Sequence, residues 1–505
     1  MTSQVTVSRT RSFSTVFLIE MWARFGYYGM AAWLVLYMVQ KLGFSDTQAN
    51  LTWGAFAALV YAAPSIGGWI GDKVLGSRRT MTIGASILAL GYLLLAIPST
   101  GLFFMYATLG VIVVGNGMFK ANAGNLVRHI YEGNDSKIDS AFTIYYMSVN
   151  IGSTISMLLT PWIKEHYGWH AAFAVCCVGL LLGLVNYFFM RHTLRHIGSK
   201  PDNEPIHWRR LFAVLAVGVA VLFTVGFILR DEVVARFCVY LAAAVILCIF
   251  VYLIAKSARS EKSGLIAALI LTLQTILFFI FYQQMSTSLT LFALRNVDWS
   301  QTLFGMRLFS WQPAQYQALN PIWIMLLSPI LAFAYAHFGK RGKDLPIASK
   351  FAIGFAVVAI GFFIYGVSGM FAVNGKVSSW FMIWGYGFYS LGELLVSGLG
   401  LAMIARYVPA RMGGFMMGAY YVAVGMSQYL GSVVANFASV PQNLTQATQT
   451  LPLYTSLFTK LGIVAVGGTV LAIILLPLMK RLSATHSDHA QAGVPAAARS
   501  ATAKE

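Results

Sequence analysis

The stretch VFLIEMWARFGYYGMAAW, residues 16–33, decides the fold, because it places two charges inside an apolar segment of membrane-spanning length. Glu20 and Arg24 lie four residues apart, so they share one face of a helix, which Tyr27 and Tyr28 extend by roughly a turn. Such groups are costly in lipid unless they contact one another or a wet cavity. The stretch therefore predicts either a buried ion pair that fixes helix packing or a site for a polar or zwitterionic solute.

The composition of the whole chain indicates a membrane protein with many spans. Of its 505 residues, 58% are hydrophobic and only 10% are charged, whereas soluble domains carry about 25% charged residues. The mean hydropathy is +0.69. The polar, basic start precedes an apolar run long enough to stay in the membrane, so we expect no cleaved signal peptide. The four cysteines lie in apolar segments without ligand spacing, so we expect neither a disulfide nor a metal site.

Apolar segments of about 20 residues recur along the chain and predict fourteen transmembrane helices. Their spans are 13–39, 48–71, 79–98, 102–127, 140–163, 170–190, 211–229, 234–255, 264–292, 320–338, 350–373, 379–404, 412–437 and 456–479. The polar and aromatic run 296–319 is expected to be a loop outside the membrane. The chain after Lys480 is expected to be disordered.

Basic residues gather on one side of this predicted topology. With both termini in the cytoplasm, most of the 35 lysines and arginines fall in cytoplasmic segments, and only Arg24 and Lys120 lie within the membrane. This bias favours cytoplasmic N- and C-termini. It also accounts for the formal net charge of +18 without nucleic-acid binding. We therefore expect a multi-pass protein of the inner (plasma) membrane, with the lipid bilayer as a partner.

The link between the second and third predicted helices reads GGWIGDKVLGSRR, residues 67–79. Its glycines allow close helix approach, and Asp72 is expected to contact Arg78 or Arg79 across a tight turn. The segment resembles the loop signature of the major facilitator superfamily, which latches the cytoplasmic gate. The alternative interpretation is a structural turn with a surface ion pair.

Two acids and two bases lie in the apolar cores of segments that are far apart in the sequence: Glu20, Arg24, Lys120 and Glu393. Each of them requires a partner or water inside the membrane. A Lys120–Glu393 salt bridge would join the two halves of the chain, and it would break and re-form as a cavity opens alternately to either side. The alternative is a static pair that only holds helices together.

Several motifs around these residues resemble the proton-dependent oligopeptide transporter family, also called POT or PTR2. Residues 20–29 are similar to its ExxERFxYYG motif. Further matches are GNGMFKAN around Lys120, FTIYYMSVNIGS from Phe142, QALNP up to Pro321 and GELLVSGLG around Glu393. The motifs occur in the family's order, and the resemblance covers nearly all of residues 13–480.

The resemblance implies an all-α membrane protein with the major facilitator fold, in which two additional helices of prokaryotic members separate two six-helix bundles. The implied divisions are a cytoplasmic tail 1–12, an N-terminal bundle 13–190, a linker with the two extra helices 191–263, a C-terminal bundle 264–480 and a disordered cytoplasmic tail 481–505. The implied activity is import of di- and tripeptides, with peptide-like drugs as further substrates, driven by the proton as coupling ion. We expect no other cofactor, no nucleic acid and a monomer.

The resemblance also implies a site for the constant parts of a zwitterionic peptide. Arg24 and Lys120 are expected to bind the carboxylate, and Glu393 the ammonium group. Neutral residues would complete the site, as amide partners and as adaptable aromatic walls: Asn150, Asn320, Tyr27, Tyr28, Tyr61 and Tyr420. The alternative for these neutral residues is packing and hydrogen bonding between helices.

Position 23 departs from the family motif, which has a second glutamate immediately before the arginine. Ala23 can neither take a proton nor neutralise Arg24, so Glu20 becomes the sole acidic partner and proton coupling is expected to be weakened. Ala31 and Gln283 stand where many relatives carry an opposite-charge pair. Their neutrality predicts an outer gate that is held by packing or neutral hydrogen bonds.

The resulting hypothesis is a symporter of protons with di- or tripeptides that works by alternating access. It is not expected to be an enzyme, because the sequence contains no nucleotide-binding loop, metal cluster or nucleophile constellation. One alternative is transport of another small anionic or zwitterionic solute, such as nitrate or a peptide-like drug. The other is a peptide receptor that does not transport.

Overall fold

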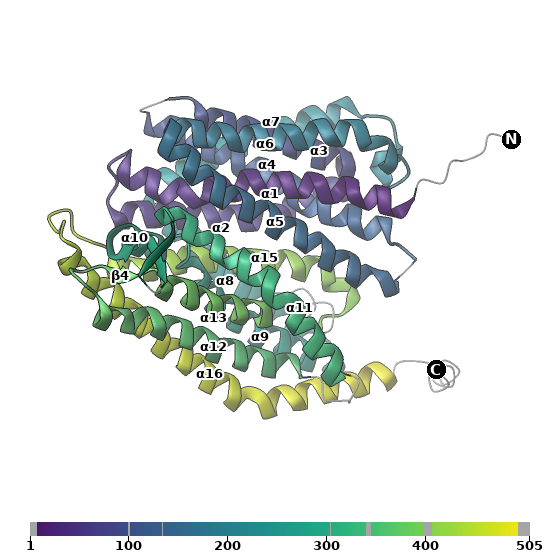
Figure 1. The fold of residues 1–505 in the computed structure, drawn as a ribbon. Helices are drawn as coiled ribbons and strands as arrows, with labels where there is room; N and C mark the ends of the chain where they lie inside the picture. Colours follow the sequence, from purple (N-terminus) through teal and green to yellow (C-terminus); the bar gives the residue numbers. More distant parts are fainter. Residues whose placement is uncertain are drawn as a thin grey trace.

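A computed structural model gives the fold over residues 8–98, 101–133, 135–303, 305–339, 345–396 and 407–492. Long helices run side by side through the whole molecule (Figure 1). Eleven helices in these ranges are long and apolar enough to cross a membrane. Each of the fourteen predicted segments contains helix where it is described, which confirms the all-α prediction.

The first half of the chain forms α1 (Arg9–Gln40), α2 (Asp46–Ile70), α3 (Ser77–Ala96), α4 (Leu102–Ile130), α5 (Asp135–Tyr167) and α6 (Trp169–Met190). A hairpin of α7 (Trp208–Arg230) and α8 (Glu232–Lys256) follows. The second half forms α9 (Arg259–Gln283), α10 (Ser288–Asn296), α11 (Leu319–Gly339), α12 (Ile347–Val367), α13 (Trp380–Val396), α15 (Ala410–Ala435) and α16 (Ala447–Ala492). Short helical turns η1 (Gly71–Leu75), η2 (Arg191–Leu194) and η3 (Lys200–Asn203) lie between α2 and α7.

The predicted segment 264–292 is not one helix, because the chain breaks between α9 and α10. The break falls at a polar run whose side chains bind locally and across to α15. The Gln284 side-chain amide donates to the carbonyl of Gly431 at 2.8 Å, and Ser288 donates to the Gln284 side-chain oxygen at 2.7 Å. Hydropathy alone does not reveal this break, since apolar residues continue on both sides of it.

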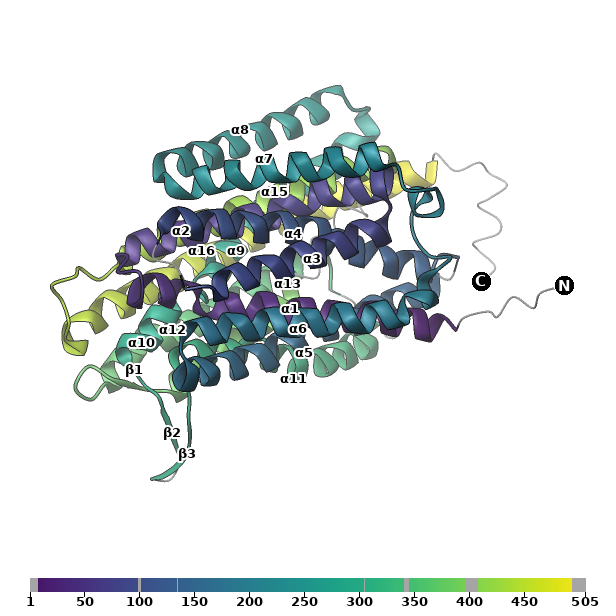
Figure 2. The ribbon, with the colours of Figure 1, turned by 90° about the horizontal axis from the view of Figure 1, so that it is seen from above.

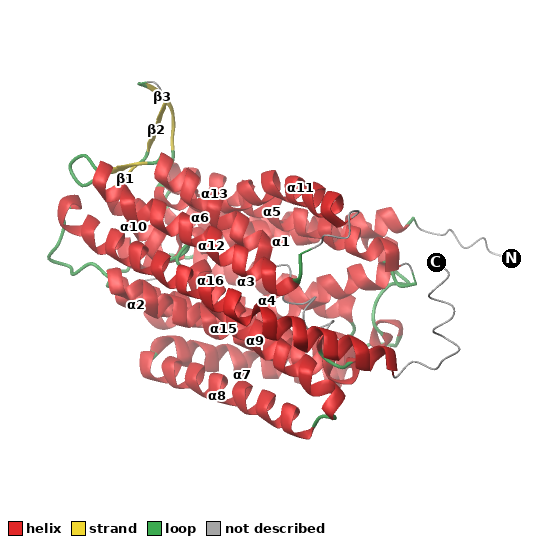
Figure 3. Cartoon of the chain, turned by 90° about the horizontal axis from the view of Figure 1, so that it is seen from below, coloured by secondary structure: helices red, strands yellow, loops and turns green. Residues whose placement is uncertain are grey.

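Of the two predicted non-helical regions, the first has the expected bounds, because α10 ends at Asn296 and α11 begins at Leu319, whereas the second does not. The run 296–319 contains β1 (Val297–Asp298), the antiparallel pair β2 (Ser300–Leu303) and β3 (Met306–Ser310), and η4 (Pro313–Ala318). The β2–β3 pair projects from one end of the helices (Figures 2 and 3). Helix α16 continues past Lys480 to Ala492, so the tail that was predicted as disordered begins as helix. Residues 493–505 lie outside the described ranges.

The two halves meet along two helix pairs, α2 with α15 and α5 with α11, while α7 packs on α4 and α8 on α15. Small residues allow the close approach of α2 and α15. A Cβ on Gly54 would lie 2.6 Å from the Ser432 Cβ, and one on Gly425 would lie 2.5 Å from the Ala58 carbonyl oxygen. Bulkier residues at these glycines would therefore separate the halves.

Both ends of the helical region lie at one end of the molecule. Figure 2 shows that α1 begins and α16 ends at the same end of the molecule, and the segment between α6 and α7 lies at that end too. This placement agrees with the predicted even number of spans. We call this the terminal end, and we call the end that carries the β2–β3 pair the distal end.

Candidate functional site

The site begins with the ion pair of α1. The Arg24 Nε donates to a carboxylate oxygen of Glu20 at 2.7 Å, and both residues are buried, with 5% and 2% of their surface exposed. The second Glu20 oxygen and the Arg24 Nη2 have no hydrogen-bond partner among the residues that the structure describes. Buried charged groups with unused hydrogen-bonding capacity can receive a polar ligand or water. Ala23 beside them is also buried.

Lys120 reaches the same region from α4. Its Nζ lies 4.7 Å from the centre of the Tyr61 ring, a cation–π contact between α4 and α2. The ammonium group is within electrostatic range of both Arg24 and Glu20. Two cations and one carboxylate thus share one wall of the site, leaving one positive charge in excess.

The opposite wall comes from the second half of the chain. The Asn320 side-chain amide on α11 donates to a Glu393 oxygen on α13 at 2.6 Å and to the Ser390 hydroxyl at 3.0 Å. Glu393 is 6% exposed. This carboxylate is therefore buried, with a neutral donor as its partner.

Tyrosines connect the two walls. Tyr28 is within electrostatic range of Arg24 and Glu20 on its own helix and of Glu393 across the molecule, and it interacts with Tyr282 of α9. Tyr27 packs edge-to-face on Tyr28, with ring centres 5.2 Å apart. Tyr61 has the same reach to Arg24 and Glu393. The predicted charged residues and these three tyrosines therefore converge on one region between the halves.

The contacts that the structure gives for Asn150 and Tyr420 are with neutral residues. The Asn150 amide donates to the Tyr146 carbonyl of its own helix at 2.9 Å. Tyr146 itself is within electrostatic range of Glu393. Tyr420 is buried, contacts Thr275 and packs edge-to-face on Tyr421 at 6.2 Å. These contacts are typical of packing within and between helices. A role of Asn150 and Tyr420 in peptide binding stays a prediction.

The predicted salt bridge between Lys120 and Glu393 is not formed in the part of the chain that the structure describes. Lys120 lies over Tyr61 instead, and Glu393 accepts from Asn320. A gate that closes through this pair stays a prediction about another conformation.

Sequence reasoning missed Tyr282, Tyr389 and Tyr146, which all lie within electrostatic range of Glu393. Tyr146 lies inside the motif FTIYYMSVNIGS, and Tyr282 lies next to the predicted gate residue Gln283. These two positions could therefore have been predicted as site residues from the sequence.

The arginines after η1 have a different acidic partner from the predicted one. Asp202, from η3, lies 3.7 Å from Arg78 and accepts the backbone amides of Arg78 and Arg79 at 3.1 and 3.4 Å. Asp72 instead accepts from Asn125 at 3.1 Å, and among the described residues it forms no ion pair with either arginine. A carboxylate is favoured at the start of α3 by the free amides and the helix dipole. The loop contact is therefore corrected to Asp202, and its role as a latch stays a prediction.

The chain resembles known proteins over nearly its whole length. Residues 78–451 match the family model described as PTR2, the POT family. Dipeptide and tripeptide permease B of Aliivibrio fischeri is 41% identical over 480 residues, covering 94% of this chain and 96% of that protein. The protein of that name from Salmonella typhimurium is 40% identical, with the same coverage of both chains.

Solved structures agree with these relatives. A crystal structure of tetrameric PepTSo2 is 61% identical, with a TM-score of 0.87, covering 94% of this chain and 100% of that one. A peptide transporter POT in complex with sulfate is 28% identical, with a TM-score of 0.81 and coverage of 94% and 95%. The major facilitator fold expected from the resemblance is thereby confirmed. The chain belongs to the POT family.

Proposed function

We propose that the chain imports di- and tripeptides by alternating access and couples their movement to protons. The observation that carries this proposal is the separation of charge in the central site. Arg24 and Lys120 supply positive charge from the first half, and Glu393 supplies negative charge from the second half. A short peptide carries the complementary charges at its two ends whatever its side chains are.

The neutral residues support this assignment. Asn320 already orients the Glu393 carboxylate, so an incoming ammonium group would meet a fixed acceptor. Tyr28 reaches both charged walls, and tyrosine walls suit variable side chains because they offer apolar faces with a hydroxyl group. The relatives named dipeptide and tripeptide permease B support the same substrate class.

The decisive experiment measures uptake of radiolabelled dialanine into proteoliposomes that contain the purified protein. Unlabelled dialanine is expected to compete, whereas N-acetyl-dialanine, dialanine amide, free alanine and nitrate compete weakly or not at all. In Glu393→Gln, the preference for dialanine over N-acetyl-dialanine should fall, while its preference over the amide persists. Equal competition by nitrate would favour the alternative of a small-anion transporter. Dialanine binding without counterflow would favour the receptor alternative.

We propose weakened proton coupling as a property of this chain, because Ala23 occupies the buried place beside Arg24.

We also propose that the N- and C-termini lie in the cytoplasm, because the lysines and arginines gather on that side of the predicted topology. The predicted domain divisions are part of this proposed topology. We also propose that the protein is a monomer, since the central site draws its residues from one chain. Light scattering of the detergent-solubilised protein would measure its mass, and a mass four times that of the chain would instead match the tetrameric PepTSo2 structures.

A further inference from the structure

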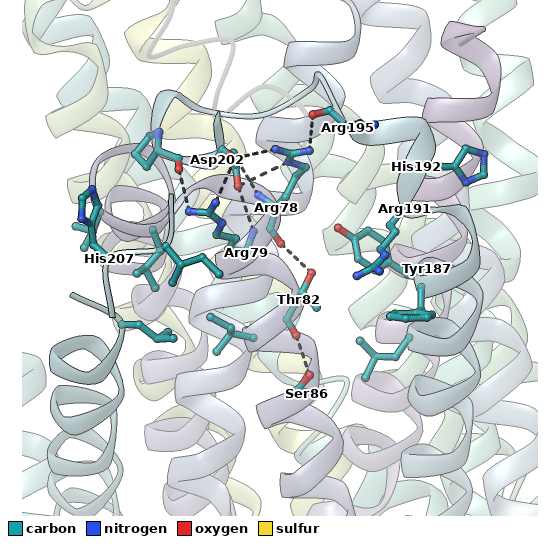
Figure 4. A pocket seen from close by; sticks show the side chains of 18 residues that line it. Arg78, Arg79, Thr82, Ser86, Tyr187, Arg191, His192, Arg195, Asp202 and His207 are labelled. Atoms are coloured by element: carbon teal, nitrogen blue, oxygen red, sulfur yellow. Dashed lines mark hydrogen bonds and ion pairs between the residues drawn. The ribbon is translucent and has the colours of Figure 1, made fainter. Parts of the chain in front are cut away.

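A cavity lies away from the central site, at the terminal end of the molecule. Its volume is about 760 Å³, and it lies between α3, α6, the segment 191–207 and the start of α7. Figure 4 shows Arg78, Arg79 and Asp202 at one side of it, with Thr82 and Ser86 following along α3. None of the peptide-site residues lines this cavity, so it calls for a separate explanation.

The lining of this cavity carries excess positive charge. Four arginines line it, Arg78, Arg79, Arg191 and Arg195, whereas Asp202 is the one acid among the described lining residues. The Asp202 carboxylate already accepts the amides of Ser199 and Arg78. An additional anion would therefore meet uncompensated charge.

The four arginines are not equally engaged. Arg78 donates to the carbonyls of Leu194 and Arg195 at 2.8 and 2.7 Å, and Arg79 donates to those of Pro201 and Glu204. These two are held by the loop. Arg191 and Arg195 are exposed, and neither has an acidic partner within the described ranges.

The lining also has an apolar part that is open to the surroundings of the helices, beside the polar residues Thr82, Ser86, Tyr187, His192 and His207. Leu184 and Phe188 come from α6, Ile83 from α3 and Leu211 from α7. Phe188 is 59% exposed, and its ring lies under the Arg191 guanidinium at 4.2 Å. Ile206 is 46% exposed. Cationic groups at the end of a span, with exposed apolar side chains beside them, match the layered chemistry of one bilayer leaflet.

We propose that this cavity binds an anionic glycerophospholipid from the surrounding leaflet. Arg191 and Arg195 hold the phosphodiester, and the acyl chains lie along Ile83, Leu184 and Phe188. A soluble phosphate compound would leave the exposed apolar part of the cavity uncovered, which favours the lipid. The occupant also contacts the segment that carries Asp202, and so braces the contact with the start of α3.

The test uses native mass spectrometry of the full-length protein in detergent, titrated with phosphatidylglycerol. Phosphatidylcholine of the same chain length and inorganic phosphate serve as comparison ligands. The double variant Arg191→Gln/Arg195→Gln should bind phosphatidylglycerol roughly ten- to thirtyfold more weakly, as expected for two lost surface cations. The matched control Arg209→Gln/Arg210→Gln removes two arginines at the start of α7 that do not line the cavity, and it should bind normally.

A third variant keeps all the charges. Leu184→Trp fills the apolar part of the cavity and should also weaken phosphatidylglycerol binding, while dialanine uptake reports that the protein is folded. Equal losses in both arginine double variants would overturn the proposal, because general surface charge would then explain binding. Displacement of the lipid by an equal concentration of inorganic phosphate would overturn the assignment to a lipid. Unchanged binding in Leu184→Trp would overturn the placement of the acyl chains.

Discussion

Arg295 of α10 holds Asp46 of α2 through two contacts, with its terminal nitrogens 2.6 and 2.7 Å from the two carboxylate oxygens. Tyr454 accepts from the same guanidinium at 2.6 Å, and the backbone amide of Val440 donates to Asp46 at 3.0 Å. The halves are thus joined ionically at the distal end. The neutral outer gate predicted from Ala31 and Gln283 is therefore corrected, because an ion pair joins the halves at this end. A neutral bond crosses beside it, from Asn50 to Asn436 at 3.0 Å. The Gln283 bond to Ser432, also 3.0 Å, lies within the second half.

The first prediction concerns this ion pair. Asp46→Asn should destabilise the closed distal end by on the order of 3 kcal/mol, because Arg295 loses a bidentate partner in a partly buried place. Hydrogen exchange of peptides covering 41–47 and 436–446 should therefore become faster. Asp298→Asn is the control, since Asp298 is exposed and accepts from Ser300 rather than from the other half. Unchanged exchange in Asp46→Asn would show that packing alone holds this end closed.

A second prediction concerns the missing acid. Ala23→Glu should raise proton-driven dialanine uptake several-fold relative to counterflow, because a protonatable group returns beside Arg24. Counterflow needs only binding and alternation, so it should change less. Ala23→Gln has the same shape without the proton site and should leave the ratio of the two rates unchanged. If wild-type uptake already follows an inward pH gradient strongly, the idea of weakened coupling fails.

The third prediction addresses the cation–π contact of Lys120. Tyr61→Leu should weaken dialanine binding by about 1 kcal/mol, or about fivefold, because the ammonium group loses the ring that positions it. Tyr61→Phe keeps the ring and should bind within about twofold of wild type. Dissociation constants from isothermal titration calorimetry would decide. Equal losses in both variants would assign the effect to the hydroxyl group instead.

The fourth prediction separates the two acids near the start of α3. Asp202→Asn should lower Tm more than Asp72→Asn, because Asp202 is buried and serves three backbone amides and a guanidinium. The expected cost is roughly 2 kcal/mol for weakened charge-assisted hydrogen bonds, with little change for Asp72. Light-scattering or tryptophan-fluorescence melts in one detergent would measure both. A larger effect from Asp72→Asn would restore the contact that the sequence predicts.

Most of the fold could be predicted from local patterns of apolar and charged residues in the sequence. Hydropathy located the fourteen helical segments because each span is a continuous run that needs no knowledge of its neighbours. The charged site residues were equally visible, since Glu20, Arg24, Lys120 and Glu393 are exceptions within apolar runs. Their convergence followed from the cost of isolated charge in lipid.

Contacts between polar residues at helix ends and in linkers were not predictable in this way. Asp46 and Arg295 are 249 residues apart, and each lies near a helix end where charges are common. Asp202 was missed because its linker has no periodic pattern, whereas Asp72 lay close to the arginines in sequence. Tyr282 was overlooked because an aromatic residue in an apolar run looks like core packing until its neighbours are known.

The interruption between α9 and α10 has a mechanical consequence. Around Gln284–Thr287 the backbone does not form the regular hydrogen bonds of a continuous helix. The break can therefore act as a hinge, about which the nine-residue helix α10 and its Arg295 rotate while α9 stays packed against α15. Opening the distal end then requires breaking side-chain contacts such as that of Arg295 with Asp46, and no helical turn has to unfold first.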